Sequence, residues 1–127
     1  MKKYEGFRDL VVFQLSYKLA MEIFELTKKF PKEELYSLTD QIRRSSRSVP
    51  VNIAEGFRKR QYPKMFANKL SDSDGEASET QVWLDLSKDC GYIEESLRNK
   101  LVEQYEEVGK MLGRMIQQAE DFKPFQN

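Results

Sequence analysis

Residues 97–119 read LRNKLVEQYEEVGKMLGRMIQQA, and their pattern determines the fold class. Apolar side chains recur there at spacings of 4, 4, 3, 4, 3 and 4 residues, namely at Leu97, Leu101, Tyr105, Val108, Leu112, Met115 and Ala119. This is the spacing of a helix that packs one face against neighbouring helices. The stretch therefore predicts a long helix with one side in a helical core.

Two further helices are expected before this seam. Residues 63–91 predict one, because Pro63 suits the first helical position and a Cys-Gly pair follows the last apolar residues. Residues 35–57 keep the same apolar rhythm, with Pro50 inside it. A proline at that position lacks a backbone donor, so we expect a kink or a local break there, with Gly56 as the C-terminal cap.

The first helix is expected over residues 10–30, with Asp9 as its N-cap and Pro31 as its stop. No segment alternates in the manner of a strand. Four helices with short connections predict an all-α protein, an antiparallel up-and-down four-helix bundle. We expect this bundle to occupy residues 1–119 and residues 120–127 to form a loose C-terminal tail.

The composition narrows the class of function. The 127 residues, 39% of them hydrophobic, suffice for one domain. There is no histidine and only one cysteine, Cys90, which removes the commonest general base, the commonest metal ligand and any internal disulfide. No apolar run is long enough to span a membrane, and the first residues lack a secretory leader. We therefore expect a cytoplasmic protein that is not an enzyme and binds no metal or cofactor.

Positive charge gathers between Ile42 and Lys64, although the whole chain carries 21 basic and 21 acidic residues. Against one acid, Glu55, this block has seven basic residues: Arg43, Arg44, Arg47, Arg58, Lys59, Arg60 and Lys64. Guanidinium groups bind phosphate oxygens in pairs, and such contacts release counterions from nucleic acid. The neighbouring rings of Phe57 and Tyr62 could stack on unpaired bases. The block therefore predicts a phosphate-binding surface for RNA or DNA.

The third helix is acidic in compensation, with eight acids against Lys88 alone between residues 70 and 95. A calcium loop at residues 72–76 is rejected, because aligning its glycine leaves two ligand positions without a suitable side chain. A di-iron centre in its usual form needs histidine, which is absent. Glu76 and Glu79 fit better as partners of arginines in the second helix, within one subunit or across an interface. Neutralisation of the third helix thus competes with phosphate binding.

One long motif resembles a known family. The run from Gln41 to Gly56, QIRRSSRSVPVNIAEG, resembles the signature of the four-helix-bundle family of proteins encoded in 23S rRNA intervening sequences. Residues 7–10, the connection at residues 30–38, and Glu79 with residues 91–93 resemble flanking landmarks of the same family. The resemblance extends over about residues 7–116.

That resemblance implies an up-and-down bundle that assembles as a homopentamer. It also implies a likeness to the accessory variability proteins of diversity-generating retroelements, which present a basic surface to nucleic acid and to a reverse transcriptase. Arg43, Arg44 and Arg47 fall on the matching motif, whereas Arg58, Lys59 and Arg60 match only in being basic after the glycine. We assign structural roles to three other residues: Asn52 next to the Pro50 break, Glu55 in a buried or interfacial pair, and Glu79.

Two hypotheses follow from the sequence. In the first, the protein is an oligomer that binds nucleic acid through the basic block, with no membrane involved. In the second, it is a protein–protein scaffold or a reverse-transcriptase accessory subunit, and its arginines form structural salt bridges at interfaces. Charge reversal at the arginines would abolish binding in the first case and break the oligomer in the second.

Overall fold

Four helices make up nearly all of the chain. The computed structural model describes residues 4–124 and contains α1 (Val11–Thr27), α2 (Leu38–Arg58), α3 (Pro63–Asp89) and α4 (Glu95–Gln117). Short 3-10 turns lie at Phe7–Asp9 (η1), Lys32–Glu34 (η2) and Ala119–Phe122 (η3). No strand occurs within this described range. The predicted all-α class is confirmed.

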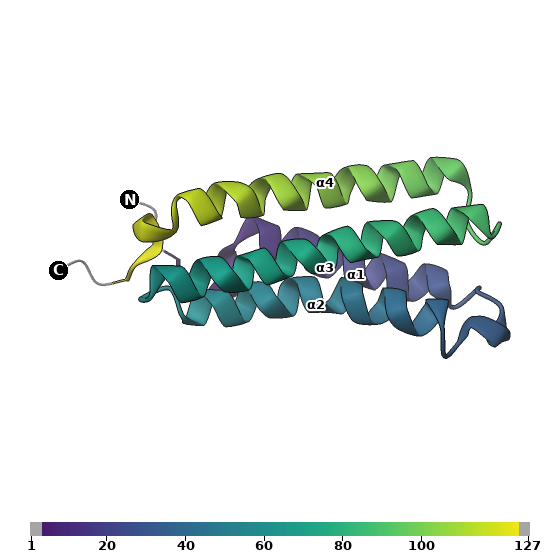
Figure 1. Cartoon of the computed structure of the whole chain (residues 1–127), viewed down its shortest axis with the longest axis horizontal. Helices are drawn as coiled ribbons and strands as arrows, with labels where there is room; N and C mark the ends of the chain where they lie inside the picture. The colour runs from purple at the N-terminus through teal and green to yellow at the C-terminus, as the bar shows by residue number, and fades with distance from the viewer. Residues whose placement is uncertain (1–3, 125–127) are drawn as a thin grey trace.

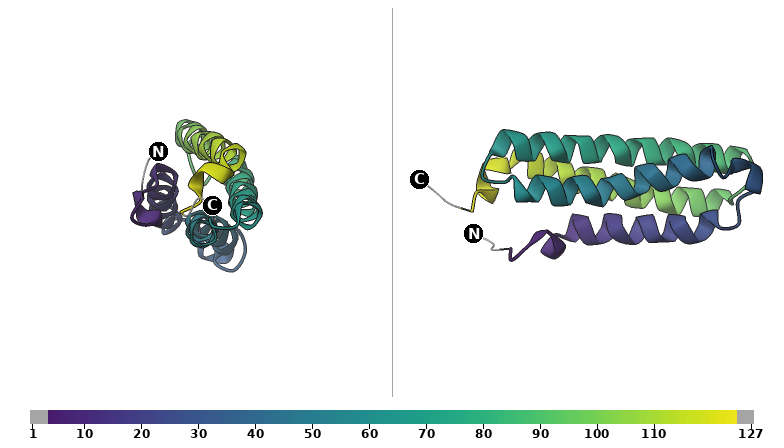
Figure 2. Two further views of the ribbon diagram at one scale, coloured as in Figure 1. Left: turned by 90° about the vertical axis from the view of Figure 1, so that its left-hand side faces the viewer. Right: turned by 90° about the horizontal axis from the view of Figure 1, so that it is seen from below.

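Successive helices run up and down beside one another (Figure 1). The end-on view places α1, α2, α3 and α4 in that order around the bundle axis (Figure 2). The most extensive contact is between α2 and α3, and the thinnest is between α1 and α4. The two ends of the described chain meet, since the ring of Tyr4 stacks on that of Phe122 at 5.8 Å. The predicted antiparallel bundle is therefore confirmed.

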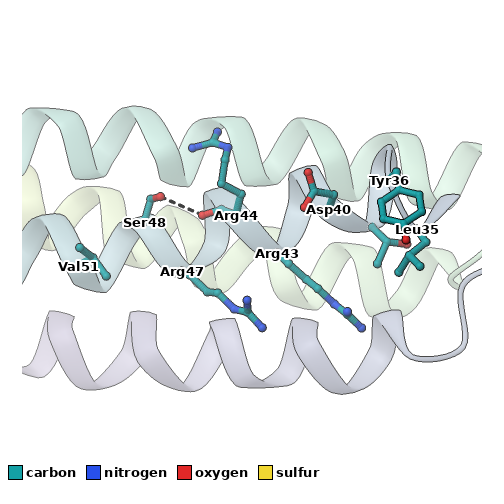
Figure 3. Close-up of a pocket in the computed structure, with 9 residues that line it drawn as sticks. Leu35, Tyr36, Asp40, Arg43, Arg44, Arg47, Ser48 and Val51 are labelled. Carbon is teal, nitrogen blue, oxygen red and sulfur yellow. Dashed lines mark hydrogen bonds between the residues drawn. The ribbon is translucent and has the colours of Figure 1, made fainter.

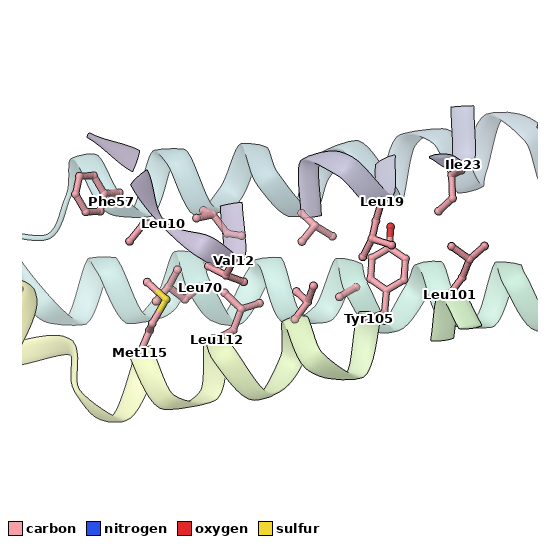
Figure 4. Close-up of a cluster of buried hydrophobic side chains, with 14 of the residues drawn as sticks. Leu10, Val12, Leu19, Ile23, Phe57, Leu70, Leu101, Tyr105, Leu112 and Met115 are labelled. Atoms are coloured by element: carbon pink, nitrogen blue, oxygen red, sulfur yellow. The ribbon is translucent and has the colours of Figure 1, made fainter. Parts of the chain in front are cut away.

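The apolar seam of α4 lies in the core, as its spacing predicts (Figure 4). Five of its residues are buried within the helix, and Ala119 is buried just after it, whereas Leu97 is partly exposed. The other helices bury their own apolar faces against this seam, among them Leu19 and Ile23 of α1 and Leu70 of α3. Burying such side chains stabilises the fold by about 1.5–3 kcal/mol each.

Small and hydroxyl-bearing residues let α2 and α3 approach closely. The Ser73 hydroxyl donates to the carbonyl of Val49 at 2.8 Å, and the hydroxyl oxygens of Thr80 and Ser45 lie 2.8 Å apart. Because these groups are buried, each would carry a desolvation penalty without its partner. The contact between the two helices is thus fixed in register as well as in separation.

Gly56 belongs to this close contact and is not a helix cap, so that prediction is wrong. It lies inside α2, which ends two residues later at Arg58. A Cβ atom added at Gly56 would lie only 3.0 Å from the Cβ atom of Lys69 on α3. The helices can approach this closely because the residue has no side chain.

α2 also continues through Pro50 without interruption, so of the two predicted outcomes, a kink or a local break, the break does not occur. Val49 and Ile53, on either side of the proline, are fully buried and hold the segment against the core. Proline removes a single helical hydrogen bond, and the surrounding packing outweighs that loss. In the same turn the Asn52 side-chain amide donates to the Ser48 carbonyl at 2.9 Å.

The helix ends differ in how well the sequence predicts them. Pro63 does stand in the first turn of α3, as expected. α3 ends in a Schellman motif: Gly91 has φ of +81°, and the amides of Gly91 and Tyr92 donate to the carbonyls of Lys88 and Ser87, each at 2.9 Å. The Cys-Gly pair therefore ends the helix because glycine adopts the left-handed conformation at little cost.

Both predicted ends of α1 are wrong. Leu10, not Asp9, is the N-cap residue, and the Asp9 carboxylate instead accepts hydrogen bonds from the backbone amides of Glu5 at 2.8 Å and Gly6 at 3.3 Å. At the other end the helix stops at Thr27, well before Pro31. The Thr27 hydroxyl lies 2.7 Å from the Ile23 carbonyl, where it satisfies one of the acceptors of the last turn.

The predicted loose tail is wrong for residues 120–122. Those residues complete η3, and the ring of Phe122 packs 5.2 Å from that of Phe66. The bundle domain therefore extends at least to Phe122. Residues 125–127 of the predicted tail, like residues 1–3 of the predicted domain, lie outside the described range.

Candidate nucleic-acid interface

The predicted basic surface is divided between two places. Arg43, Arg44 and Arg47 lie in the first half of α2, whereas Arg58 is its last residue and the other basic residues follow in the turn to α3 and its start. The 11 residues from Arg47 to Arg58 correspond to about 16 Å along the helix axis. The seven residues therefore form two separate groups.

Two arginines of the first group, together with a lysine at the end of α1, lie over one aromatic ring of α1. The Arg43 guanidinium carbon lies 4.9 Å from the centre of the Phe24 ring, that of Arg47 lies 5.6 Å away, and the Lys28 ammonium nitrogen 4.8 Å away. Arg43 and Arg47 extend from α2 toward α1 (Figure 3). We call these four residues the Phe24 cluster. Such contacts with the ring face favour the cations by about 0.5–1 kcal/mol each at exposed sites.

The Phe24 cluster carries excess positive charge. Lys28 pairs with Glu25 at 3.2 Å, but within residues 4–124 no carboxylate forms an ion pair with Arg43 or Arg47. Arg43 and Arg47 are also one helical turn apart, a spacing at which like charges repel. Three cations thus share one acidic neighbour, and an anion placed between the two arginines would relieve the repulsion.

Arg43 is held ready for such a ligand. Its Nε atom donates to the hydroxyl of Thr27 at 2.8 Å, so the C-terminal end of α1 fixes the guanidinium plane. Its terminal nitrogens make no hydrogen bond to any described residue. A guanidinium fixed in this way loses less side-chain entropy when it binds an oxyanion.

Arg44 has a different role and leaves the predicted nucleic-acid set. It extends to the other side of α2, where its guanidinium bonds to Glu76 at 3.2 Å and to Glu79 (Figure 3). These bonds raise the pKa of Arg44, with Glu76 as the larger cause. The pKa of Glu79 is lowered, first because Trp83 donates to it at 3.0 Å and then because of Arg44. The arginine is therefore paired within its own subunit, as the competing interpretation of the sequence proposed.

In the second group one arginine, Arg60, is held against the protein. The Arg60 guanidinium lies 4.0 Å over the Phe57 ring and donates to the Phe57 carbonyl at 3.1 Å. Burial, and then the charge of Arg58, lower the pKa of Arg60. Arg58 and Lys64 are exposed, and Lys59 is half-buried.

The exposed fractions of two residues near this turn show that the contacts predicted for them are wrong. Phe57 is only 2% exposed, so it cannot stack on a base, whereas Tyr62 is 63% exposed. Glu55 is exposed and pairs with Lys69 of α3 at 3.6 Å within the same chain. It is therefore not part of a buried pair, and its visible partner lies within the subunit.

A groove of about 580 Å³ runs along α2 beside the Phe24 cluster (Figure 3). Its lining includes three arginines of α2, one carboxylate and several exposed apolar or aromatic residues: Arg43, Arg44, Arg47, Asp40, Leu35, Tyr36 and Val51. Tyr36 is 91% exposed, although its neighbours belong to an ordered turn. We call this the α2 groove.

Sequence reasoning missed Phe24, Lys28 and Tyr36. The first two were detectable in principle, because they lie four residues apart on one helical face. In an antiparallel pair, the end of the first helix adjoins the beginning of the second, where Arg43 and Arg47 lie. Nothing in the sequence distinguishes Tyr36 from the other exposed tyrosines, since its exposure is a property of the turn.

The other candidate chemistries find no support in the described residues. Residues 72–76 are helical in α3, so the rejected calcium loop does not form. Among residues 4–124 no group of three cysteine or carboxylate side chains is arranged to hold a metal ion. None of the helices described combines the length and apolar character needed to cross a bilayer.

The comparison with protein families decides the identity of the chain. The sequence model described as 23S rRNA-intervening sequence protein matches residues 8–114. The chain belongs to this family. The matched range contains the whole Phe24 cluster and the turn between α2 and α3, so both basic groups lie within the family domain.

A solved structure agrees with this membership. A Bacteroides thetaiotaomicron protein of the S23 ribosomal protein family, described as having unknown function, is similar with a TM-score of 0.75 and 31% sequence identity. The match covers 84% of this chain and 98% of that one. No protein among the curated ones matches the chain. The relatives therefore establish the family and the bundle, and the activity has to be argued from the surface.

Proposed function

We propose that this member of the 23S rRNA-intervening sequence family is a non-enzymatic protein that binds nucleic acid through phosphate groups at the Phe24 cluster. One observation supports this most strongly: three cations surround Phe24, and only Glu25 among the described carboxylates pairs with any of them. The contributing residues are Lys28, Arg43 and Arg47. Arg44 is excluded because Glu76 and Glu79 neutralise it.

Phosphate fits this arrangement in both charge and geometry. Arginine forks bind phosphate oxygens through charge-assisted hydrogen bonds, which are stronger than those between neutral groups. The binding would be largely independent of base sequence, since phosphate contacts position a nucleic acid without reading it. Arg58 and Lys64, about 16 Å or more farther along, supply a second contact for a longer strand.

Self-association is part of the same proposal, because a single cluster has a small charge. A second groove, of about 530 Å³, lies between α1 and α2; its lining includes Tyr17, Met21 and Val51, all half-exposed, and it adjoins the α2 groove at Arg47 and Val51. Such apolar surface favours contact with another protein surface. An assembly, the homopentamer implied by the family resemblance, would present several clusters to one strand and raise its affinity through avidity.

The test of binding is fluorescence anisotropy with a short labelled oligouridine at increasing salt. Affinity should fall steeply with salt. The double variant Arg43→Gln/Arg47→Gln should bind weakly, with a logarithmic salt slope smaller by roughly 1.4, because each phosphate that is no longer neutralised reduces the slope by about 0.7. Arg44→Gln is the matched control and should retain the wild-type slope. Binding that does not depend on salt, or equal losses in both variants, would contradict the proposal.

The second candidate function is a protein scaffold, favoured by the apolar groove between α1 and α2. For such a scaffold we propose a reverse transcriptase as the partner, on the basis of the resemblance to the accessory proteins of diversity-generating retroelements. Light scattering separates the candidates: if the arginines hold an assembly together, Arg43→Glu/Arg47→Glu lowers the particle mass. In the nucleic-acid case the mass stays unchanged while binding is lost.

A further inference from the structure

We propose that the ligand of the α2 groove is single-stranded nucleic acid, with a base stacked on Tyr36 and the neighbouring phosphates on Arg43 and Arg47. This inference rests on the proposed function and adds the class of nucleic acid and the residue that selects it. Aromatic side chains beside a cationic track are the usual elements of single-strand binding, because every unpaired base has a face to stack.

Tyr36 is presented to solvent by a braced turn. Its ring is 91% exposed, yet the carboxylate of Glu34 ties the turn together by accepting hydrogen bonds from the Ser37 hydroxyl at 2.6 Å and the Tyr92 hydroxyl at 2.8 Å. The backbone amide of Leu38 donates to the same carboxylate at 3.3 Å. These bonds, those of Ser37 and Tyr92 first, lower the pKa of Glu34, so the carboxylate stays ionised and keeps the brace near neutral pH. The turn that carries Tyr36 is thus ordered, and the ring is left uncovered.

The order of side chains along α2 suits a strand. Arg43 and Arg47 are separated by one helical turn, about 6 Å along the axis. That separation is comparable to the spacing of neighbouring phosphates in an extended strand. Tyr36 lies at one end of the α2 groove, with Leu35 beside it and the arginines farther along (Figure 3). A base on Tyr36 would therefore place the neighbouring phosphates in the same groove as the two guanidinium groups.

Acidic residues limit the width of the cationic track. On the side of α3, Glu76 and Glu79 neutralise Arg44, and Asp40 lines the edge of the α2 groove that faces the same side (Figure 3). On α1, Glu25 pairs with Lys28. Neighbouring helices in a bundle lie roughly 8–10 Å apart, so the cationic track is about one helix wide. A duplex would extend over these carboxylates, whereas a single strand follows the track alone.

The experiment compares three labelled probes by anisotropy: an oligouridine, an abasic strand with the same number of phosphates, and an RNA duplex of that length. The wild-type protein should bind the oligouridine most tightly. Tyr36→Ala should weaken that binding by about 5- to 150-fold, the usual effect of removing one ring on which a base stacks, and leave the abasic strand unaffected. Tyr36→Phe should bind as the wild type does, since it keeps the ring.

Tyr62→Ala is the matched control, because Tyr62 is also an exposed tyrosine but lies at the α2–α3 turn. With an oligouridine short enough to occupy only the α2 groove and not the second contact at Arg58 and Lys64, it should not change the affinity. A silent Tyr36→Ala, an equal loss in Tyr62→Ala, or equal wild-type affinity for all three probes overturns the inference. If Arg43→Gln/Arg47→Gln abolishes binding while Tyr36→Ala is silent, only this inference fails. If the double arginine variant binds all probes like the wild type, the proposed function fails as well.

Discussion

Replacing Arg44 and Arg47 in turn separates an arginine that stabilises the fold from one that is free to bind a ligand. Arg44 makes two ion pairs with Glu76 and Glu79, and its side chain is 46% exposed, so surface values apply. Each pair is worth about 0.2–1 kcal/mol, and its removal also leaves two like charges three residues apart, which adds about 0.2–0.5 kcal/mol of repulsion. Arg44→Gln should therefore lower the free energy of unfolding by about 1–2 kcal/mol.

Arg47→Gln should change that free energy by less than about 0.5 kcal/mol. The substitution removes a long cation–π interaction, 5.6 Å from the Phe24 ring, which contributes about 0.5–1 kcal/mol or less. It also removes the repulsion from Arg43, about 0.2–0.5 kcal/mol, so the two effects largely cancel.

Urea denaturation followed by circular dichroism measures both changes. The protein concentration must be the same in each experiment, because self-association would couple stability to concentration. The midpoint should move clearly downward for Arg44→Gln and stay nearly constant for Arg47→Gln. The reverse order would refute the assignment of Arg44 to structure and Arg47 to ligand binding.

Three further predictions concern the bundle. Folding lowers the pKa of Glu79 from its ordinary value of 4.5. The stability that its carboxylate contributes is therefore complete above that pH and is lost as the pH falls through the lower pKa of the folded state. The difference in stability between the wild type and Arg44→Gln should then close in a series of denaturation experiments at decreasing pH. Phe122→Ala should lower the free energy of unfolding by about 1–3 kcal/mol, and with it the melting temperature, because the half-buried ring of Phe122 packs on Phe66. A loose tail would give no change. Gly56→Ala should destabilise the bundle by about 1–3 kcal/mol, because Gly56 lies so close to Lys69. Gly75→Ala should stabilise the bundle by about 0.5–1 kcal/mol, because there is open space around Gly75. If calorimetry gave a change in stability of the same sign for both variants, it would contradict the close approach of α2 and α3.

The sequence predicted the buried face of α4 from periodicity alone, whereas Val82 and Leu86 of the apolar pattern expected in the third helix are exposed. The seam from Leu101 to Met115 lies in the core, and Pro63 and Gly91 mark ends of α3 because their backbone preferences are strong and local. The ends of α1 were not predictable in this way. Asp9 has a capping side chain, but the preceding chain turns back so that its carboxylate binds the amides of Glu5 and Gly6.

Gly56 and Arg44 show why the remaining features escaped prediction. A glycine near a helix end can be a cap or a point of close contact, and an arginine on the surface can bind a ligand or form an ion pair. Which role each residue takes depends on the residue that faces it from the neighbouring helix. Gly56 faces Lys69 and acts as a point of close approach, and Arg44 faces two carboxylates of α3 and is neutralised. The identity of a facing residue is tertiary information, which charge counts along a chain do not contain.

The Phe24 cluster likewise depends on contacts between helices, which the sequence does not show. Counting charges between residues 42 and 64 included Arg44, which two carboxylates of α3 neutralise, and omitted Lys28, which lies over the Phe24 ring. The functional surface crosses from α1 to α2, so a window along the sequence could recover only part of it.

The most direct measurement is the NMR signal of each arginine Nε–H group during titration with oligouridine. If phosphate binds at the Phe24 cluster, the signals of Arg43 and Arg47 should shift progressively and saturate together, while that of Arg44 stays in place. Shifts confined to Arg44, or to Arg58 and Arg60 at the far turn, would contradict binding at the Phe24 cluster.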